Sequence, residues 1–197
     1  MRRHWVFVLL ALCATCTALA LEGGTGTPFS PYVDESGNIR RPEGYRDTWT
    51  HLGTYFIVGD SEQTHRMHSV YAEKGYLDSY NQTGQWPDGT VLIKEVMRTA
   101  GAQLTTGASN WATEPEVWFV MVKDNKRRFP NHPLWGEGWG WALYRSERPN
   151  VQVAKNYKQD CLGCHVPAKE TDFIYLQGYP SIRKKTDGPL KNGRLGR

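Results

Sequence analysis

Residues 83–95 read TGQWPDGTVLIKE, and this stretch carries the clearest structural signals of the chain. Gly84 favours the end of a helix, so a helix is predicted over residues 73–83. Pro87, Asp88 and Gly89 favour a tight turn. The β-branched residues that follow predict a strand over residues 90–98. A helix, a turn and a strand therefore follow one another directly.

Outward from this unit, the chain alternates between strand-like runs and turn signals. Further strands are predicted over residues 52–58, 66–72, 117–123 and 138–145. Short helices are expected over residues 42–51 and from about residue 151 into the region of Cys161. The pattern predicts an α+β fold, an antiparallel β-sheet with a few helices. We expect one domain over residues 41–183, preceded by an irregular segment over residues 21–40.

The first twenty residues have the layout of a secretory signal peptide. A basic head at Arg2 and Arg3 precedes a short apolar stretch and a small-x-small sequence ending at Ala20. The apolar run is shorter than a membrane span needs. A lipoprotein site at Cys13 or Cys16 lacks the small residues that should precede it. Residues 1–20 are therefore predicted to direct export to the periplasm, leaving a mature chain without a membrane span.

The charge balance gives no indication of a nucleic-acid partner. The chain has 24 Lys and Arg, including Arg2 and Arg3 of the predicted signal peptide, and 20 Asp and Glu. The remaining 177 residues carry 22 basic and 20 acidic side chains, a net charge of +2. Basic residues gather in the last part of the chain, where residues 184–197 are predicted to form a basic, flexible tail.

Cys161-Leu162-Gly163-Cys164-His165 is the strongest chemical signal in the sequence. Two thiols at this spacing can form thioethers with the two vinyl groups of a haem, and the adjacent imidazole can bind the iron. One such motif predicts one covalent haem c, held by Cys161 and Cys164 with His165 as the metal ligand.

Other uses of this cysteine pair explain less of the motif. A disulfide or a thioredoxin-type redox pair gives no reason for the adjacent histidine. A zinc site needs two further ligands, and the mature chain has no other cysteine.

The position of the motif indicates an open iron site. It lies late in the chain, behind a strand-rich body that is expected to build the distal side of the haem pocket. A simple electron carrier usually supplies a sixth ligand, often methionine. The candidates Met67, Met97 and Met121 all lie in strand-like runs and are expected to pack in the core.

The chain resembles the cytochrome P-460 family from about residue 45 to residue 183. The matching residues are Ser69-Val70-Tyr71, 80–95, Val122-Lys123-Asp124, 139–144 and Ala154-Lys155-Asn156. The phrase TGxxPDGTVLIKE is more specific to the family than the haem motif itself. The resemblance implies a periplasmic homodimer with an antiparallel sheet covering the distal haem face.

The resemblance also implies a role for Lys94. In the branch that oxidises hydroxylamine, a lysine at this position bonds to a carbon of the porphyrin rim. A related branch, the cytochromes c′-beta, lacks this bond and binds nitric oxide. From the strand pattern alone Lys94 is interpreted as a surface lysine, since Leu92 and Val96 share its face while Ile93 and Met97 lie opposite with Glu95.

The distal groups are less clearly marked. Removing protons from hydroxylamine requires an acid or a base near the iron. Candidates are Glu95, Glu137 and His68, with Asp160 and Arg66 as further possibilities, although each is also an ordinary residue type for its position. The aromatic residues expected to pack near the haem are Phe119, Trp118, Trp139, Trp141 and Tyr144.

The sequence therefore predicts a haem oxidoreductase that oxidises hydroxylamine and passes its electrons to another cytochrome. A non-catalytic protein that binds nitric oxide is the alternative. A simple electron carrier is a third possibility, which a six-coordinate iron would indicate. The presence of Lys94 favours the enzyme, because this residue permits the cross-link.

Overall fold

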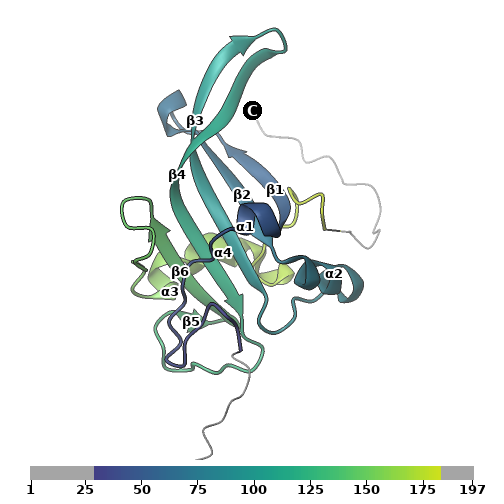
Figure 1. Cartoon of the computed structure of the whole chain (residues 1–197), viewed down its shortest axis with the longest axis vertical. Helices are drawn as coiled ribbons and strands as arrows, with labels where there is room; N and C mark the ends of the chain where they lie inside the picture. The colour runs from purple at the N-terminus through teal and green to yellow at the C-terminus, as the bar shows by residue number, and fades with distance from the viewer. Residues whose placement is uncertain (1–28, 183–197) are drawn as a thin grey trace, which may run out of the picture.

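The computed structural model describes residues 29–182; the predicted signal peptide and basic tail lie outside these residues. Its centre is a six-stranded sheet in the order β1-β2-β3-β4-β6-β5, with every neighbouring pair antiparallel (Figure 1). The strands are β1 (Thr50–Ile57), β2 (Arg66–Ala72), β3 (Val91–Leu104), β4 (Gly107–Lys123), β5 (Trp135–Gly136) and β6 (Trp139–Arg145). This sheet and its few short helices confirm the α+β class.

The helical segments are short, and half of them follow the last strand. They are α1 (Tyr45–Thr48), η1 (Glu62–Thr64), α2 (Lys74–Thr83), α3 (Tyr157–Asp160), α4 (Leu162–His165) and η2 (Val166–Thr171). The irregular stretch predicted before residue 41 is described only from residue 29, where it contains a bridge between Val33 and Ile39. Ile39 is buried in the core, so this part of the segment is packed against the domain.

The helix, turn and strand around residues 83–95 form as predicted. Gly84 ends α2 with a φ of 78°, and its N–H donates to the carbonyl of Tyr80 at 2.7 Å. Gly89 has a φ of 83° in the turn, and the Thr90 hydroxyl donates to the Pro87 carbonyl at 2.7 Å. Both glycines take the left-handed conformation that a β-carbon disfavours. The local turn chemistry therefore predicts this unit correctly.

Strands β3 and β4 are longer than predicted. They continue together to Leu104 and Gly107 and form a two-stranded arm that projects beyond the other strands (Figure 1). The arm contains glycine, alanine and small polar residues and is mostly exposed, so it has neither high β-propensity nor an alternating pattern. Cross-strand pairing extends the two strands where the sequence gives no strand signal.

Two predicted helices are wrong in extent. The helix expected over residues 42–51 is reduced to α1, because Trp49 is already extended and β1 begins at Thr50. The helix expected from residue 151 does not begin until Tyr157. The Val153 N–H donates to Leu143 of β6, and the Asn156 side chain caps α3 by accepting from the Lys158 N–H. These contacts keep residues 151–156 out of a helix.

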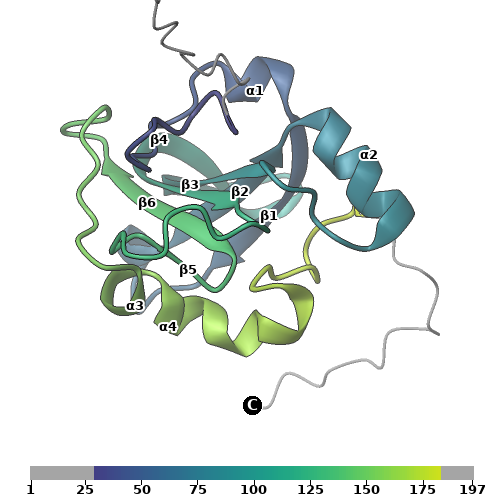
Figure 2. The same cartoon turned by 90° about the horizontal axis from the view of Figure 1, so that it is seen from below.

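Each face of the sheet carries its own apolar core. In Figure 2, α3 and α4 lie below one face, and α1 lies above the other. The core facing the C-terminal helices contains Leu52, Val70, Leu92, Met121, Trp139, Trp141, Phe173, Ile174 and Tyr179. The opposite core contains Ile39, Tyr45, Val91, Ile93, Trp118, Val120, Val122, Trp135 and Tyr144. Because both faces are covered, β3 is apolar in consecutive positions instead of alternating.

Candidate haem site

A cavity of about 390 Å³ lies between the sheet and the C-terminal segment. Four strands contribute to its wall on the sheet side, and the segment after α3 closes the other side. Its lining residues are Tyr55, Ile57, His68, Val70, Leu92, Lys94, Phe119, Met121, Cys164, His165, Ile174, Tyr175 and Tyr179. This size and a mostly apolar lining with a few polar groups are typical of a site for a small molecule or cofactor.

The cysteine motif lies on α4, directly against this cavity. Cys161 is buried in the core, and burial raises the pKa of its thiol to about 11. Cys164 is exposed and lines the cavity with His165. Both cysteines are free, so they are not joined in a disulfide.

His165 has a fixed ring orientation. Its Nδ1 lies 2.7 Å from the carbonyl oxygen of Phe173, which can only accept, so Nδ1 carries the proton. Trp141 packs edge-on against the ring at 5.0 Å between centroids. Burial lowers the pKa of His165. A neutral imidazole with its Nε2 lone pair free is the form that binds a metal, and a backbone acceptor on Nδ1 is the usual means of orienting such a ligand.

Lys94 lies in the same cavity. Its Nζ is 4.2 Å from the centre of the Phe119 ring, on the neighbouring strand β4. Burial lowers the pKa of Lys94, and this effect is larger than the opposite effect of Cys164 and Cys161, which raise it. The interpretation of Lys94 as a surface residue is therefore wrong, since the sheet face that carries it is covered by the C-terminal segment.

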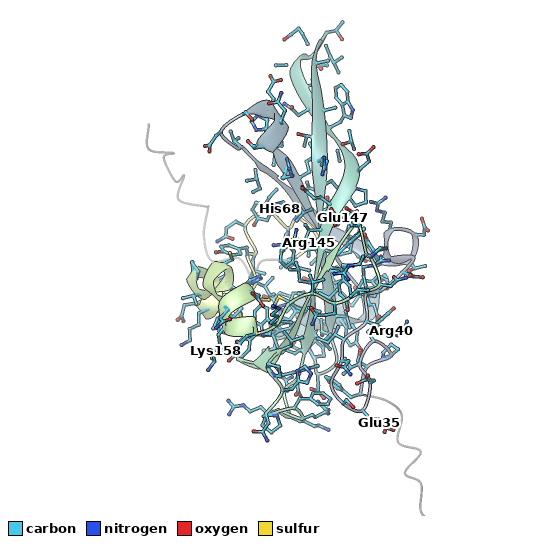
Figure 3. The ribbon with its side chains drawn as sticks, turned by 90° about the vertical axis from the view of Figure 1, so that its left-hand side faces the viewer. Glu35, Arg40, His68, Arg145, Glu147 and Lys158 are labelled. Atoms are coloured by element: carbon cyan, nitrogen blue, oxygen red, sulfur yellow. The ribbon has the colours of Figure 1, made fainter. Side chains whose placement is uncertain are left out.

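His68 also lies in this cavity, on β2. In Figure 3 the sheet is seen nearly edge-on; His68 lies on the side of the C-terminal helices, where Lys158 is labelled, and Arg40 and Glu35 lie on the other side. In the register of β2 and β3, His68 pairs with Val96, and Lys94 pairs with Val70. Such diagonal neighbours are about 7–8 Å apart. Burial, followed by the charges of Lys94 and Arg66, lowers the pKa of His68 to about 4.

Glu95 lies away from the cavity, on the opposite face of β3. It is completely buried, and both of its oxygens accept hydrogen bonds from Arg46, one of them from Nε at 3.1 Å. Trp118 donates to the hydroxyl of Tyr45 at 2.8 Å nearby, and burial followed by the Glu95 charge raises the pKa of Tyr45 to about 12. Glu95 is therefore not positioned to act as a distal group.

Glu137 and Asp160 also lie outside the cavity. Glu137 is exposed in the turn before β6, has a φ of 57°, and lines a separate hollow of about 370 Å³ with Trp135. Asp160 is exposed and accepts the backbone N–H groups of Lys155 and Asn156. Neither carboxylate reaches the site that the sequence suggested for it.

The expected aromatic residues divide between the two cores. Phe119 lines the cavity, and Trp139 and Trp141 belong to the core on its side. Trp118 and Tyr144 belong to the opposite core, so the expectation that they pack near a haem is wrong. The split follows from strand alternation, which places neighbouring residues of β4 on opposite faces.

Several cavity residues were not predicted from the sequence. Tyr55 and Ile57 alternate on β1 and are detectable only once the inward face is known. Ile174, Tyr175 and Tyr179 follow the motif without any periodic pattern, and the Phe173 carbonyl that orients His165 has no sequence signature. Met121 lines the cavity, although methionine was expected only in the core.

A protein-family comparison agrees with this geometry. The model for cytochrome P460 matches residues 42–176, which is more than half of the chain. The chain belongs to the cytochrome P460 family. Among the curated proteins, none matches it. Membership of the cytochrome P460 family implies a haem cofactor, and the match covers the sheet, the motif and every cavity residue except Tyr179.

The cavity fits a haem of this kind. Cys164, the oriented imidazole of His165 and an apolar wall meet in it, and Cys161 lies buried in the adjoining core. Over residues 29–182 there is no cluster of three or more His, Cys, Asp or Glu side chains that could hold a metal ion by themselves. In the same range, no helix is long and apolar enough to cross a membrane.

Proposed function

We propose that this member of the cytochrome P460 family is exported to the periplasm and carries one haem c. Cys161 and Cys164 would form the thioether bonds, and His165 would bind the iron through Nε2. The free thiols beside the cavity and the hydrogen bond from His165 Nδ1 to Phe173 support this assignment. The family resemblance further supports a homodimer.

We further propose that the protein oxidises hydroxylamine, or a related small nitrogen compound, on the distal face of the haem. The haem would supply an iron that binds the substrate nitrogen and takes up its electrons for an external acceptor cytochrome. The position of Lys94 carries this proposal. Its amine lies in the cavity with Cys164 and His165, where a lysine–porphyrin bond requires it.

The local environment of Lys94 suits such a bond. Burial favours the neutral amine, which is the nucleophilic form, and lowers its pKa. Formation of this bond would replace one N–H of the amine and one C–H of the porphyrin rim by an N–C bond. It would therefore release two protons and two electrons, and an external two-electron oxidant would have to accept the electrons.

Binding of nitric oxide without turnover, as in the cytochromes c′-beta, is the second candidate. The apolar wall of the cavity, with Phe119 beside Lys94, favours small uncharged ligands. The two candidates differ in the state of Lys94, since a free amine would leave an ordinary haem c.

The experiment compares the purified holoprotein with Lys94→Met and with a control, Lys126→Met, which alters an exposed lysine outside the cavity. Absorption spectra, mass spectrometry of the haem peptide and hydroxylamine oxidation with a dye acceptor are measured. We expect a cross-linked Lys94 peptide and a red-shifted ferrous Soret band in the wild type and the control. Lys94→Met should show ordinary haem c and at least about tenfold slower turnover, equivalent to about 1.4 kcal/mol.

A free Lys94 in an inactive wild-type holoprotein would exclude the hydroxylamine proposal. Reversible nitric oxide binding by the same sample would then support the second candidate. A six-coordinate, low-spin iron that binds neither ligand would indicate an electron carrier.

A further inference from the structure

The cavity contains ionisable groups but no carboxylate. Its lining residues include three tyrosines, Lys94, Cys164, His165 and His68, and no aspartate or glutamate among the described residues. Oxidation of hydroxylamine releases protons, so a group within the cavity has to accept them. The candidate acceptors can be tested one by one against the geometry.

Most of these groups are unsuited to accepting a proton. His165 is committed through Nδ1 to the Phe173 carbonyl, and its Nε2 would bind the iron. Cys164 and Lys94 would be bonded to the haem. The tyrosines are weak acids that keep their proton at neutral pH, and burial raises the pKa of Tyr179 further. His68 is the remaining base in the described lining.

His68 differs from the other four histidines of residues 29–182 in having no hydrogen bond. His51 bonds to Thr54 at 2.9 Å, and His165 bonds to Phe173. His65 and His132 each accept a backbone N–H, at 3.0 and 3.1 Å. A strand histidine is commonly held by such a bond, whereas both ring nitrogens of His68 are free for a ligand.

The surroundings of His68 favour its neutral, accepting form. The charged or titratable groups around it are Arg66 on its own strand, Tyr55 on β1, Lys94 on β3, and Cys164, His165, Tyr175 and Tyr179 from the C-terminal segment. Burial is the largest cause of its lowered pKa, followed by Lys94 and then Arg66. Lys94 bonded to the porphyrin rim is uncharged, so the cross-link would remove the second cause and strengthen His68 as a base.

We propose that His68 is the proton acceptor for the substrate in this cavity. A free ring nitrogen takes the proton from an N–H or O–H bond of hydroxylamine. The electron pair of that bond first remains on the substrate. The two electrons are then transferred to the external acceptor as oxidation proceeds. The proton then passes from His68 to water. This role rests on the proposed function and selects His68 from the distal candidates that the sequence suggested, in place of the carboxylates.

The test uses His68→Gln in the holoprotein, with His51→Gln as the matched control on an exposed strand position. Glutamine keeps a similar size and polarity but is not a base. Three quantities are measured by stopped flow at pH 7: hydroxylamine turnover, cyanide binding to the ferric protein, and carbon monoxide binding to the ferrous protein. Hydrogen cyanide must lose a proton in order to bind as cyanide, whereas carbon monoxide has none to lose.

We expect His68→Gln to slow turnover and cyanide association by about 10²-fold or more, with carbon monoxide association unchanged. His51→Gln should match the wild type in all three. The cyanide comparison does not depend on turnover. If His68→Gln slows cyanide association but the wild type does not oxidise hydroxylamine, the proposed function is refuted and the role of His68 as a base still stands.

Equal cyanide rates in wild type and His68→Gln would overturn the proposal. A parallel loss of cyanide and carbon monoxide rates would also overturn it, because His68 would then only shape the cavity. A low-spin wild type that becomes high-spin in His68→Gln would overturn it as well, since His68 would be an iron ligand.

Discussion

Lys94 and Glu95 are adjacent on β3 but lie in opposite environments. Glu95 is completely buried on one face and paired with Arg46, and this pair joins α1 to the sheet. Lys94 lies on the other face, in a cavity shared with His68 and His165, and has no carboxylate partner within residues 29–182. One residue has its charge satisfied, and the other is placed where it tends to lose its charge.

The difference separates a structural face from a functional one. A buried charge that is fully paired is compatible with a rigid core, while an unpaired ionisable group is costly and indicates a site. Substitutions on the Glu95 face should therefore change stability, and those on the Lys94 face should change chemistry.

The largest stability effect is expected for Arg46→Ala. This change leaves the Glu95 carboxylate buried without its partner, and we expect a loss of about 3 kcal/mol in the free energy of unfolding. Urea denaturation at pH 7 measures it. The haem spectrum of the folded protein should stay unchanged, and a change in ligand binding would argue against two separate faces.

Glu95→Gln should cost less, about 1–2 kcal/mol. The amide keeps part of the hydrogen bonding, and Arg46, whose side chain is 51% exposed, can be solvated by water. The two variants are compared in the same denaturation experiment. A loss as large as that of Arg46→Ala would show that the asymmetry in exposure does not matter.

His68 should make unfolding depend on pH. Its pKa is about 4 in the folded protein against 6.5 in the reference state, so the unfolded chain binds more protons between these values. Stability should therefore fall as the pH decreases from 6.5 to 4. Allowing for solvent screening, the contribution is about 1–2 kcal/mol. His68→Gln should show a flatter profile, and parallel profiles would contradict this.

Lys94→Met should have the smallest effect on stability. Methionine has a similar length and no charge to desolvate. The free energy of unfolding of the haem-free protein should therefore fall by less than about 1 kcal/mol, or rise. Urea denaturation of the wild-type and Lys94→Met apoproteins measures this difference. A loss of several kcal/mol would show that Lys94 is a structural residue.

Part of the fold and site could be predicted from local sequence. The turn at Gly84–Gly89 and strand β2 form at the predicted residues, since turn chemistry and short strand-forming runs act over a few residues. The haem motif is likewise local, because its chemistry depends on spacing alone. The helix expected from residue 151 does not form there, because the Val153 N–H bonds to Leu143 in β6 instead of to a helical carbonyl.

The tertiary structure decided which side chains meet. Apolar residues on both sides of Lys94 left its direction open, because β3 has an apolar core on each face. Only the packing of the C-terminal segment against one face made that face a cavity. As a result, Lys94 and His68 line the cavity, while Glu95 and Glu137 do not. Residues distant in sequence form one site only where the sheet and the C-terminal segment enclose the same space.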